Sequence, residues 1–581
     1  ATSGASSVGA SFLDHCRQLF NVPNQGTVTP VHSCEHAEHP LLAPISCSEV
    51  ESALSNQKSR ASSVSGYSPV DLKSIQSYIS KPLSIIFSYF LKSSSFFMDW
   101  LQSSVFFIYK GKGCRSDPGN YRSICIQDPF AKVYSSILTK RISSFAETYD
   151  LLPNFQFGFR SKRSTTSAAA LLHELAYTRL KKGKRTYVAY IDFAKAFDRV
   201  RRPLLFHKLQ LLGIPSQFCQ LLNFIFQSTK FFIKAGDSFT HYYTSNVGVP
   251  QGDPISLILF NLFIHDLPSS LHHNGVDLHG VRVHYLQYAD DLCLIGDTKE
   301  DLQRGLNDLE NYCAENYIEV NTSKSKVQVF HRGRLPPCAF NLSGRAIEIV
   351  NDFVYLGFGF STQLSFSNHA RRIDAKARAK CGLLFSKLPI MDLPLTLVLD
   401  LFSIFILPIY SYGLPLWLSN VCNSSLQMID STLTKFLKRY LQVPLHSNNA
   451  SIHFLTSTIP LSNKLKLIAP DALKSLSFPP CFNGYRLSFL QNPPPSSQAQ
   501  IQQHVSEILE KVPTTLWLSR MFFSIPTNKK YRRRLFREIL DSNHLQICNS
   551  TTFHPYPLPS CLCIHCGENA HCYHDRFCNP L

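Results

Sequence analysis

The spacing of apolar residues changes several times along this chain of 581 residues. Recurrence every three to four positions predicts a helix that begins near Tyr67 and a second one that runs to Trp100. Short apolar runs bounded by turn residues predict strands farther along the chain. The strands expected in this way are 105–109 with its hairpin partner 121–126, 186–192, a hairpin over 231–249, a strand, turn and strand over 281–295, 327–332 and 346–356.

The helical period returns between these strands and after them. It predicts helices at 131–149, 202–212, 217–226, 254–265, 300–315, 370–388 and 395–410. This mixture of elements indicates an α+β fold, with an all-helical part after about residue 360. A Ser-rich segment occupies the first 65 or so residues, and the prolines at 493–495 mark a linker.

Three carboxylates stand at the ends of predicted strands. Asp192 ends the strand at 186–192, and a tight turn between two apolar strands carries Asp290 and Asp291. Neighbouring carboxylates repel one another unless cations occupy the space between them, and Mg²⁺ takes hard oxygen ligands. Joining a nucleotide to a 3′-hydroxyl uses one divalent ion to lower the pKa of the hydroxyl and another to neutralise the leaving pyrophosphate. The sequence therefore predicts a two-metal nucleotidyl-transfer site, although the pair alone could be a polar hairpin turn.

Charge and composition favour a nucleic-acid partner. Lys and Arg number 58 against 40 acids, a net charge of +18, and a surface this basic attracts polyanions. The stretch 160–208, which surrounds Asp192, holds 13 basic and 3 acidic residues, although a basic run is more often a solvated helix face. The apolar stretches 83–109 and 395–417 are interrupted by charges or proline, so neither is predicted to span a membrane.

Cysteine usage and the chain start bear on the compartment. The 18 cysteines lack a regular framework of spacings and no signal peptide is evident, which predicts a reducing compartment, the cytoplasm or nucleus. Because the chain begins with Ala1 rather than Met, we expect it to be a fragment or a processed piece.

A series of short motifs follows the Trp100 region in a fixed order. They are Asn120-Tyr121-Arg122-Ser123-Ile124, Gln156-Phe157-Gly158-Phe159-Arg160, Asp192-Phe193-Ala194-Lys195-Ala196-Phe197-Asp198, Gly248 to Pro254, Tyr288-Ala289-Asp290-Asp291, Asn321-Thr322-Ser323-Lys324, Tyr355-Leu356-Gly357, and Tyr412-Gly413 with Trp417. By these motifs, over about residues 66–417, the chain resembles a non-LTR (LINE-type) retrotransposon reverse transcriptase.

The resemblance implies a right-hand polymerase fold, with fingers, a palm that carries an antiparallel sheet, and a helical thumb. The expected parts are an N-terminal segment of unknown role at 1–65, fingers and palm at 66–360, a thumb at 361–440, a helical region with a basic cluster at 441–555, and a candidate zinc knuckle at 556–581.

The resemblance also implies roles for individual residues around the metals. Asp192, the Phe193 carbonyl and Asp290 would bind two Mg²⁺ ions, with Asp291 supporting them. Phe197 matches a bulky gate that excludes a ribose 2′-hydroxyl, although a Phe is often simply core. For Asp198 we instead expect a helix N-cap, because Asp commonly accepts hydrogen bonds from free helix amides.

Further matches concern the nucleotide and the nucleic acid. Arg122 with Lys110 or Lys112 would grip the triphosphate, although exposed basic residues are usually ordinary surface charges. Lys324 matches a candidate general acid for the pyrophosphate, with a solvated loop lysine as the alternative. The resemblance implies that three further residues would contact the template or the primer. They are Gln251, Gly252, whose missing Cβ would let nucleic acid approach the backbone, and Tyr288, beside the primer terminus. For Gln251 and Gly252 the alternative is a plain turn.

The C-terminal end carries soft metal ligands. Cys563, Cys566, His574 and Cys578 have the paired spacing of a tetrahedral Zn²⁺ site. Sets that use His565, His571 or Cys572 remain open, as does a disordered Cys-rich end. A basic cluster before this segment is expected to grip RNA or DNA phosphates. It contains Lys529, Lys530, Arg532, Arg533, Arg534 and Arg537.

The function expected from the resemblance is RNA-directed DNA polymerisation by target-primed reverse transcription. Its partners would be dNTPs, an RNA template held as the element's ribonucleoprotein, and a DNA primer or target, with no membrane, in the nucleus and cytoplasm. The alternatives are a decayed or domesticated RNA-binding derivative and a group II intron maturase. No nicking site is located in the sequence.

Overall fold

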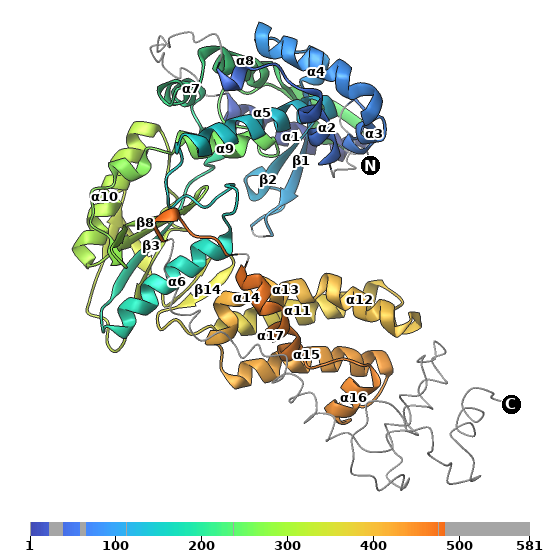
Figure 1. Ribbon diagram of the computed structural model, residues 1–581, viewed down its shortest axis with the longest axis vertical. Helices are drawn as coiled ribbons and strands as arrows, with labels where there is room; N and C mark the ends of the chain where they lie inside the picture. The colour runs from blue at the N-terminus through green and yellow to red at the C-terminus, as the bar shows by residue number, and fades with distance from the viewer. Residues whose placement is uncertain are drawn as a thin grey trace, which may run out of the picture. The chain divides into compact units, whose positions relative to one another are not determined.

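The structure, a computed structural model, describes residues 2–21, 39–57, 65–111, 113–235, 238–474 and 476–482 (Figure 1). The chain divides into two compact units. The described parts of the first unit fall within residues 1–175, 179–351 and 477–483, and those of the second within 176–178 and 352–476. The main described part of the second unit therefore begins at Asp352, near the expected end of the palm at 360, and it continues past residue 440 without a division there.

The first unit contains a four-stranded sheet that corresponds to the expected fingers. Its order is β2-β1-β4-β5. The strands are β1 (Gln102–Tyr109), β2 (Tyr121–Gln127), β4 (Lys230–Ala235) and β5 (Ser238–Tyr243). The hairpin of β1 and β2 is antiparallel and confirms the pairing predicted from sequence, whereas β1 and β4 run parallel.

Helices surround this sheet in the upper part of Figure 1. They are α1 (Thr2–Phe20), α2 (Cys47–Ser55), α3 (Pro69–Ser74), α4 (Gln76–Ser93), α5 (Pro129–Thr148), α7 (Arg202–Leu211), α8 (Ser216–Ser228) and α9 (Pro254–Phe263). Helix α1 buries Leu13 and Cys16 against Val105, Phe231 and other residues of the sheet. The Ser-rich segment thus contains a helix that completes the fingers core, a role its composition did not indicate.

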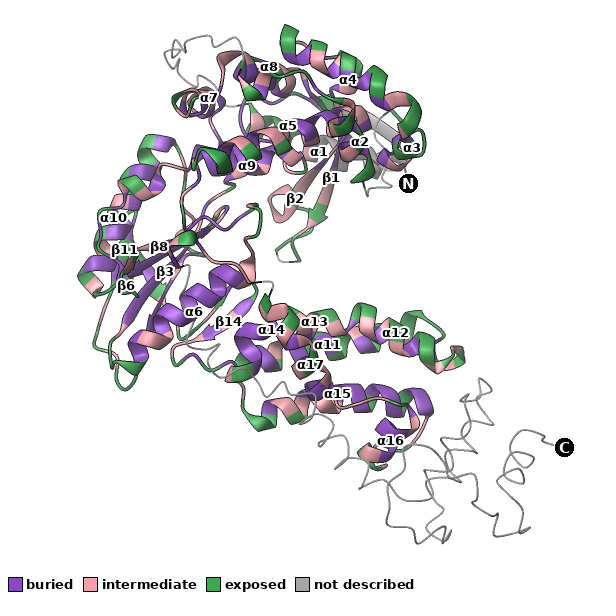
Figure 2. Ribbon diagram, viewed as in Figure 1, coloured by how far each residue is buried: buried purple, intermediate pink, exposed green. Residues whose placement is uncertain are grey.

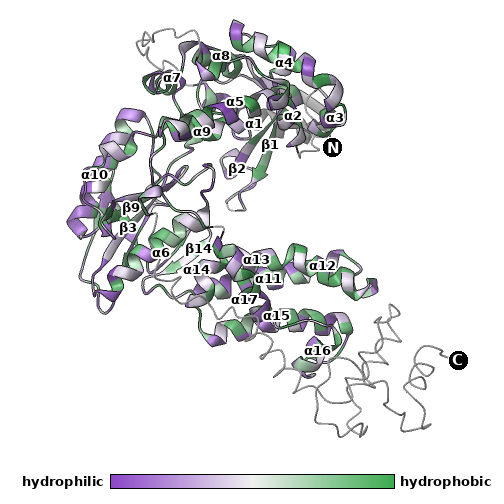
Figure 3. Cartoon of the chain, viewed as in Figure 1, coloured by the Kyte–Doolittle hydropathy of each residue, from purple (hydrophilic) through white to green (hydrophobic). Residues whose placement is uncertain are grey.

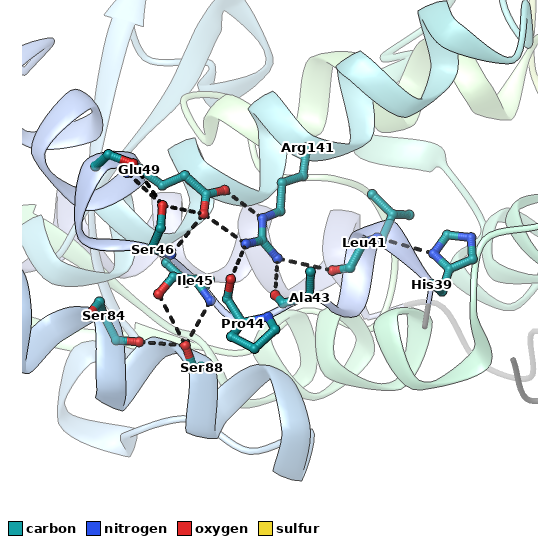
Figure 4. A network of polar contacts seen from close by, with 11 residues as sticks. His39, Leu41, Ala43, Pro44, Ile45, Ser46, Glu49, Ser84, Ser88 and Arg141 are labelled. Carbon is teal, nitrogen blue, oxygen red and sulfur yellow. Dashed lines mark hydrogen bonds and ion pairs between the residues drawn. The ribbon is translucent and has the colours of Figure 1, made fainter. Parts of the chain in front are cut away.

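Arg141 on α5 anchors the segment that leads into α2 (Figure 4). Its Nε and Nη2 donate to the two carboxylate oxygens of Glu49 at 2.7 and 2.9 Å, and Nη2 also donates to the Pro44 carbonyl at 3.0 Å. The bonds from Arg141 lower the pKa of Glu49 to about 2. Residues 39–55 are therefore fixed to the fingers by charge-assisted bonds, which are stronger than neutral ones.

The first unit also contains a six-stranded sheet, in the residues expected to form the palm, with the order β11-β12-β10-β3-β9-β8. The strands are β3 (Thr186–Asp192), β8 (Tyr285–Tyr288), β9 (Asp291–Gly296), β10 (Lys326–Phe330), β11 (Phe340–Leu342) and β12 (Arg345–Ile349), and a separate hairpin joins β6 (Val276–Leu278) to β7 (Val281–Val283). Strand β3 pairs antiparallel with both β9 and β10. Its residues are buried up to Asp192, which explains the continuous apolar run that predicted it.

Two helices of the first unit follow different patterns. In α10 (Lys299–Asn316) the buried residues recur at helical spacing on the side that packs on β9, and polar residues predominate along the rest of the helix (Figure 3). In α6 (Thr165–Lys181) residues 167–176 are all buried, as the purple ribbon in Figure 2 shows. Because α6 has no solvated face over this stretch, it lacks the amphipathic period, and the sequence analysis did not predict it.

The second unit has a short hairpin followed by helices. The elements are β13 (Asp352–Tyr355), β14 (Phe358–Ser361), α11 (Ser367–Lys387), α12 (Leu395–Phe405), α13 (Leu407–Ser411), α14 (Leu414–Trp417), α15 (Asn423–Leu441), α16 (Asn449–Leu455) and α17 (Leu461–Lys474). Gly413 has a φ of +58°, and a Cβ there would overlap the ring of Phe358. Glycine is therefore required where α14 begins.

The predicted elements differ from the structure at two places in this half of the chain. The run 346–356, predicted as one strand, is divided between β12 and β13, which belong to different sheets. The helix predicted at 395–410 is broken at Ile406, because Pro408 cannot donate a backbone hydrogen bond to the preceding turn. In the described part of the chain no single helix is long and apolar enough to cross a membrane, and one bent pair, Leu395–Ser411 with Leu414–Asn420, meets that test by length and composition only.

Candidate active site

Strand register brings the three predicted carboxylates together. In the antiparallel ladder of β3 and β9 the last pair is Asp192 with Asp291. The ladder of β8 and β9 ends with Tyr288 opposite Asp291, so Ala289 and Asp290 form the turn between them. Paired residues in such ladders have Cα atoms about 4.5–5.5 Å apart. Asp192 therefore lies beside the turn although almost one hundred residues separate them in the chain.

The carboxylates of the turn are crowded and repel one another. Burial raises the pKa of Asp290, the charge of Asp192 raises it further, and Arg122 opposes the shift. Partial burial, then the charges of Asp290 and Asp192, raise the pKa of Asp291 to about 6, although its side chain borders solvent. Crowded hard oxygen donors are the ligands that Mg²⁺ prefers, so these residues fit a divalent ion.

Lys324 forms an ion pair with Asp192. Its Nζ lies 3.3 Å from Asp192 Oδ2. Among the residues that the structure describes, no three acidic, His or Cys side chains already converge as a closed metal site. The carboxylates are neighbours by register, and Asp192, Asp290 and Asp291 are the residues that would hold a divalent ion here.

The end of β3 is clamped by the loop that contains Lys324. The Asp192 N–H donates to Ser325 Oγ at 3.1 Å, and the Asn321 N–H donates to the Asp192 carbonyl at 2.7 Å. An isolated bridge pairs Phe193 with Val320, and the bond from the Ala194 N–H to the Glu319 carbonyl closes it at 2.7 Å. The bridge uses the groups that flank Phe193, so it leaves the Phe193 carbonyl available as a ligand.

A cluster of cations faces the carboxylates. Burial lowers the pKa of Lys110, and the charges of Lys324, Lys195 and Arg122 lower it further. Lys110 follows β1 and donates to the Gly119 carbonyl at 2.8 Å, and Arg122 is exposed on β2. Lys324 pairs with Asp192 and Arg122 acts on Asp290, so at least these two cations lie near the carboxylates. A polyanion would stabilise cations that repel one another in this way. Lys112, the other predicted lysine, lies outside the described residues.

Lys195 is a member of this cluster to which sequence reasoning gave no role. It has a φ of +54°, unusual for a residue other than glycine. Sequence reasoning could have found Lys195 from two signals. These are its position in the motif that begins at Asp192 and the basic residues that surround this motif in the sequence. Helix α1 brings His15 near Lys195. Burial lowers the pKa of His15, and the charge of Lys195 lowers it further.

Phe197 is half-buried and stacked. Its ring lies 4.5 Å from that of Phe260 on α9, with 27° between the planes. The Phe197 carbonyl accepts from the Val249 N–H at 2.9 Å. The ring is thus held firmly by the core while part of its surface remains open, so packing and gating are compatible for this residue.

The predicted N-cap role of Asp198 is wrong. Asp198 lies within the short 3₁₀ turn Phe197–Arg199, and the N-cap of α7 is Arg201. Asp198 is buried, which raises its pKa to about 6, and its Oδ1 accepts from Gln251 Nε2 at 3.0 Å. The carboxylate therefore orients Gln251 instead of ending a helix.

Gly252 is glycine for a different reason from the one proposed. Its φ is +116°, and a Cβ would collide with the carbonyl of Cys125 on β2. The Cys125 N–H donates to the Gln251 carbonyl at 2.8 Å, so the loop and β2 are in backbone contact. The close approach that requires glycine is made by the fingers sheet. The role of Gln251 and Gly252 toward nucleic acid stays a prediction.

The remaining predicted sites divide between described and undescribed residues. The Tyr288 ring lies 5.9 Å from that of Phe159 at the rim of the turn. Cys563, Cys566, His574 and Cys578, with the basic cluster at 529–537, lie outside the described residues. The zinc site and the basic cluster stay predictions.

Comparison with known proteins agrees with this arrangement. Residues 108–360 match the family described as reverse transcriptase (RNA-dependent DNA polymerase). Over this matched domain the chain is similar to reverse transcriptases. All three carboxylates and the four clustered cations lie within the matched residues of this domain.

Curated proteins that are similar to this chain come from mobile elements. The RNA-directed DNA polymerase from mobile element jockey of Drosophila melanogaster is 25% identical over 407 residues, 68% of this chain and 44% of that protein. The probable polymerase from transposon X-element of the same species is 24% identical over 381 residues, 64% of this chain and 41% of that protein. The retrovirus-related Pol polyprotein from type-1 retrotransposable element R2 of Nasonia vitripennis is 27% identical over 226 residues, 39% of this chain and 22% of that protein. The chain thus spans less than half the length of these relatives.

Proposed function

We propose that the protein is an RNA-directed DNA polymerase that adds dNTPs to a DNA 3′-end on an RNA template. The observation that carries the proposal is the pairing of Asp192 with Asp291, with Asp290 in the adjoining turn. This arrangement supplies carboxylates for two-metal nucleotidyl transfer. The cation cluster beside them supports a triphosphate substrate.

Asp192, Asp290 and the Phe193 carbonyl would hold Mg²⁺, with Asp291 in support. When bound, the ions would lower the pKa of the primer 3′-hydroxyl and neutralise charge on the pyrophosphate. Arg122 and Lys110 would bind the triphosphate, and we add Lys195 to this set because its charge acts on Lys110. Lys112 is retained as a further candidate.

Lys324 would hold the proton that the pyrophosphate takes up. Its Nζ lies 3.3 Å from Asp192 Oδ2, and this proximity to a proposed metal ligand supports the role. Phe197, anchored on Phe260, would present a rigid edge to the sugar and exclude a 2′-hydroxyl. Tyr288 would pack beside the primer terminus, and Gln251, held by Asp198, would support the template side.

The wider setting is proposed from the relatives. The names of two of them are those of RNA-directed DNA polymerases from mobile elements. We extend the proposal to target-primed synthesis on the element's own RNA within a ribonucleoprotein. Such a protein would meet its RNA in the cytoplasm and its DNA target in the nucleus.

Primer extension on poly(rA)/oligo(dT) with Mg²⁺ tests the polymerase proposal. We expect the wild-type protein to extend the primer, Asp290→Asn to lose extension, and Asp277→Asn to retain it. Asp277 is a matched control because it is an exposed palm acid outside the site. Equal extension by the Asp290 variant, or RNA binding by the wild type without extension, would support a binding protein instead.

The zinc knuckle has a separate test. We propose that Cys563, Cys566, His574 and Cys578 bind one structural Zn²⁺. Metal analysis of a Cys563→Ser, Cys566→Ser double variant should show about one zinc fewer per chain than the wild type. Equal zinc content in the two proteins would exclude this ligand set.

A further inference from the structure

The turn that carries Asp290 has an unusual backbone. Ala289 has a φ of +55°, in the left-handed region that L residues rarely occupy. Its side chain is 2% exposed, so its N–H group is surrounded by protein. A buried backbone donor requires a partner, and a left-handed residue requires surrounding structure to hold it.

Gln156 provides that partner from another segment. Its Oε1 accepts from the Ala289 N–H at 2.9 Å and from the Gly158 N–H at 2.8 Å. One amide oxygen has two lone pairs, so both bonds use its full capacity. Gln156 is 1% exposed, which removes competition from water.

The segment that carries Gln156 is itself fixed to β8. The Phe157 N–H donates to the Gln287 carbonyl at 2.7 Å, and the Gln287 N–H donates to the Phe155 carbonyl at 2.9 Å. These bonds form a short parallel bridge between Gln156 and Gln287, next to the turn. Backbone hydrogen bonds to β8 therefore fix the position of Gln156 relative to the turn that follows this strand.

Gly158 and Asn261 fix the same segment from the other side. A Cβ on Gly158 would collide with the Ala289 nitrogen, so the two backbones are in direct contact. Asn261 on α9 donates from Nδ2 to the Gly158 carbonyl at 2.7 Å. The turn is therefore attached through Gln156 and Gly158 to a core helix.

We propose that Gln156 is a positioning residue for the aspartate turn: its amide oxygen holds Ala289 in the left-handed conformation and so fixes Asp290 and Asp291 against Asp192. The proposal rests on the proposed polymerase function. Misplacement of reacting groups by about 1 Å can cost on the order of 10²-fold in rate. Gln156 touches neither the substrate nor the carboxylates, and it acts through the Ala289 backbone.

Three variants separate positioning from general stability. Gln156→Leu removes the acceptor, and Gln156→Glu retains a carboxyl oxygen in its place. Gln328→Leu is the matched control, because Gln328 is also fully buried and its amide bonds to the Tyr190 hydroxyl at 3.0 Å and the Asn351 carbonyl at 2.9 Å, away from the turn. Each is compared with the wild type by Tm, by kcat and KM for dTTP, and by hydrogen exchange of the Ala289 amide.

For Gln156→Leu we expect kcat to fall by about 10–10²-fold while the KM for dTTP changes little. The Ala289 amide should exchange faster, and Gln156→Glu should restore both kcat and protection. Gln328→Leu should lower Tm and leave kcat and Ala289 exchange near wild type. Unchanged kcat or unchanged Ala289 exchange in Gln156→Leu would overturn the proposal, and so would an equal fall of kcat in Gln328→Leu.

A second-site variant keeps the test decisive if Gln156→Leu is unstable. Glycine adopts the left-handed region without strain, so Ala289→Gly should recover part of the kcat lost in Gln156→Leu. Absence of any recovery would count against the proposed mechanism. Hydrogen exchange needs no catalysis, so an inactive wild type would reject the polymerase function alone, whereas unchanged exchange would reject the role of Gln156 alone.

Discussion

The palm and the fingers contribute to the candidate site in different ways. The palm supplies Asp192 and Asp291 from directly opposite positions of a buried sheet, so the backbone ladder determines their separation. The fingers supply Lys110 and Arg122 from a two-stranded hairpin, where Arg122 is exposed. Metal ligation needs fixed donors, whereas long cationic side chains can adapt to a polyphosphate. We therefore expect palm substitutions to lower kcat and fingers substitutions to raise the KM for dNTPs.

The largest effect should follow a change in the palm. Asp192→Asn should lower kcat for extension by about 10³-fold or more, because ligation of a catalytic ion contributes several kcal/mol. Single-turnover extension measures this, with Asp277→Asn as the control. If Asp192→Asn raised the KM for dNTPs and left kcat unchanged, the distinction between the two regions would be lost.

A fingers substitution should have a smaller effect on a different parameter. Arg122→Ala should raise the KM for dTTP by about 10–10²-fold, because a charge-assisted hydrogen bond contributes about 1.5–3 kcal/mol. Steady-state kinetics at saturating template measures the effect. Arg115→Ala is the matched control, since Arg115 is an exposed arginine that lies over the Tyr109 ring of the same hairpin. If the two variants behaved alike, Arg122 would have no special role.

Phe197 sharpens the comparison because it would act on nucleotide selection and not on metal ligation or triphosphate binding. Phe197→Ala should reduce the preference for dTTP over UTP by about 10-fold or more, because a steric barrier to the 2′-hydroxyl is removed. Competition between the two nucleotides in single-step extension measures the preference. Retained selectivity would assign Phe197 to the core alone, through its contact with Phe260.

The smallest effect is a pH dependence of stability in the palm. The pKa of Asp291 is raised to about 6, so the folded state holds this proton more tightly than the unfolded chain. Metal-free protein should therefore lose stability through this group as pH rises from about 4 to 6. Tm measured across that range should fall less steeply for Asp291→Asn. An identical slope in the variant would show that the pKa of Asp291 is not raised in the folded protein.

The two corrected residues show where local sequence patterns were insufficient. Asp198 follows the ordinary preference of Asp for helix N-termini, yet it is buried and bonded to Gln251, 53 residues away. From the sequence, the missing Cβ of Gly252 could equally well let nucleic acid approach the backbone. In the structure, the atom that a Cβ there would meet is the carbonyl oxygen of Cys125 on β2. In both cases the deciding contact comes from a segment distant in the chain.

Local sequence patterns were sufficient to predict an element where neighbouring residues in the sequence determine it. The buried run of β3 predicted the strand and its end at Asp192, and the flanking apolar strands predicted the turn at Asp290. They failed for α6, which is buried over ten successive residues and shows no amphipathic period, and for α1, whose partners are strands far along the chain.

The sequence alone therefore determined the strands and the turn that carry the three aspartates, and the kinds of side chain at the site, because these depend on periodicity and on chemistry carried by single residues. Only the tertiary structure decided that Asp192 stands opposite Asp291, that Lys195 joins the cation cluster, and that Gln156 supports Ala289. The physical reason is that register and cross-segment hydrogen bonds join residues whose separation in the chain leaves no local pattern to read.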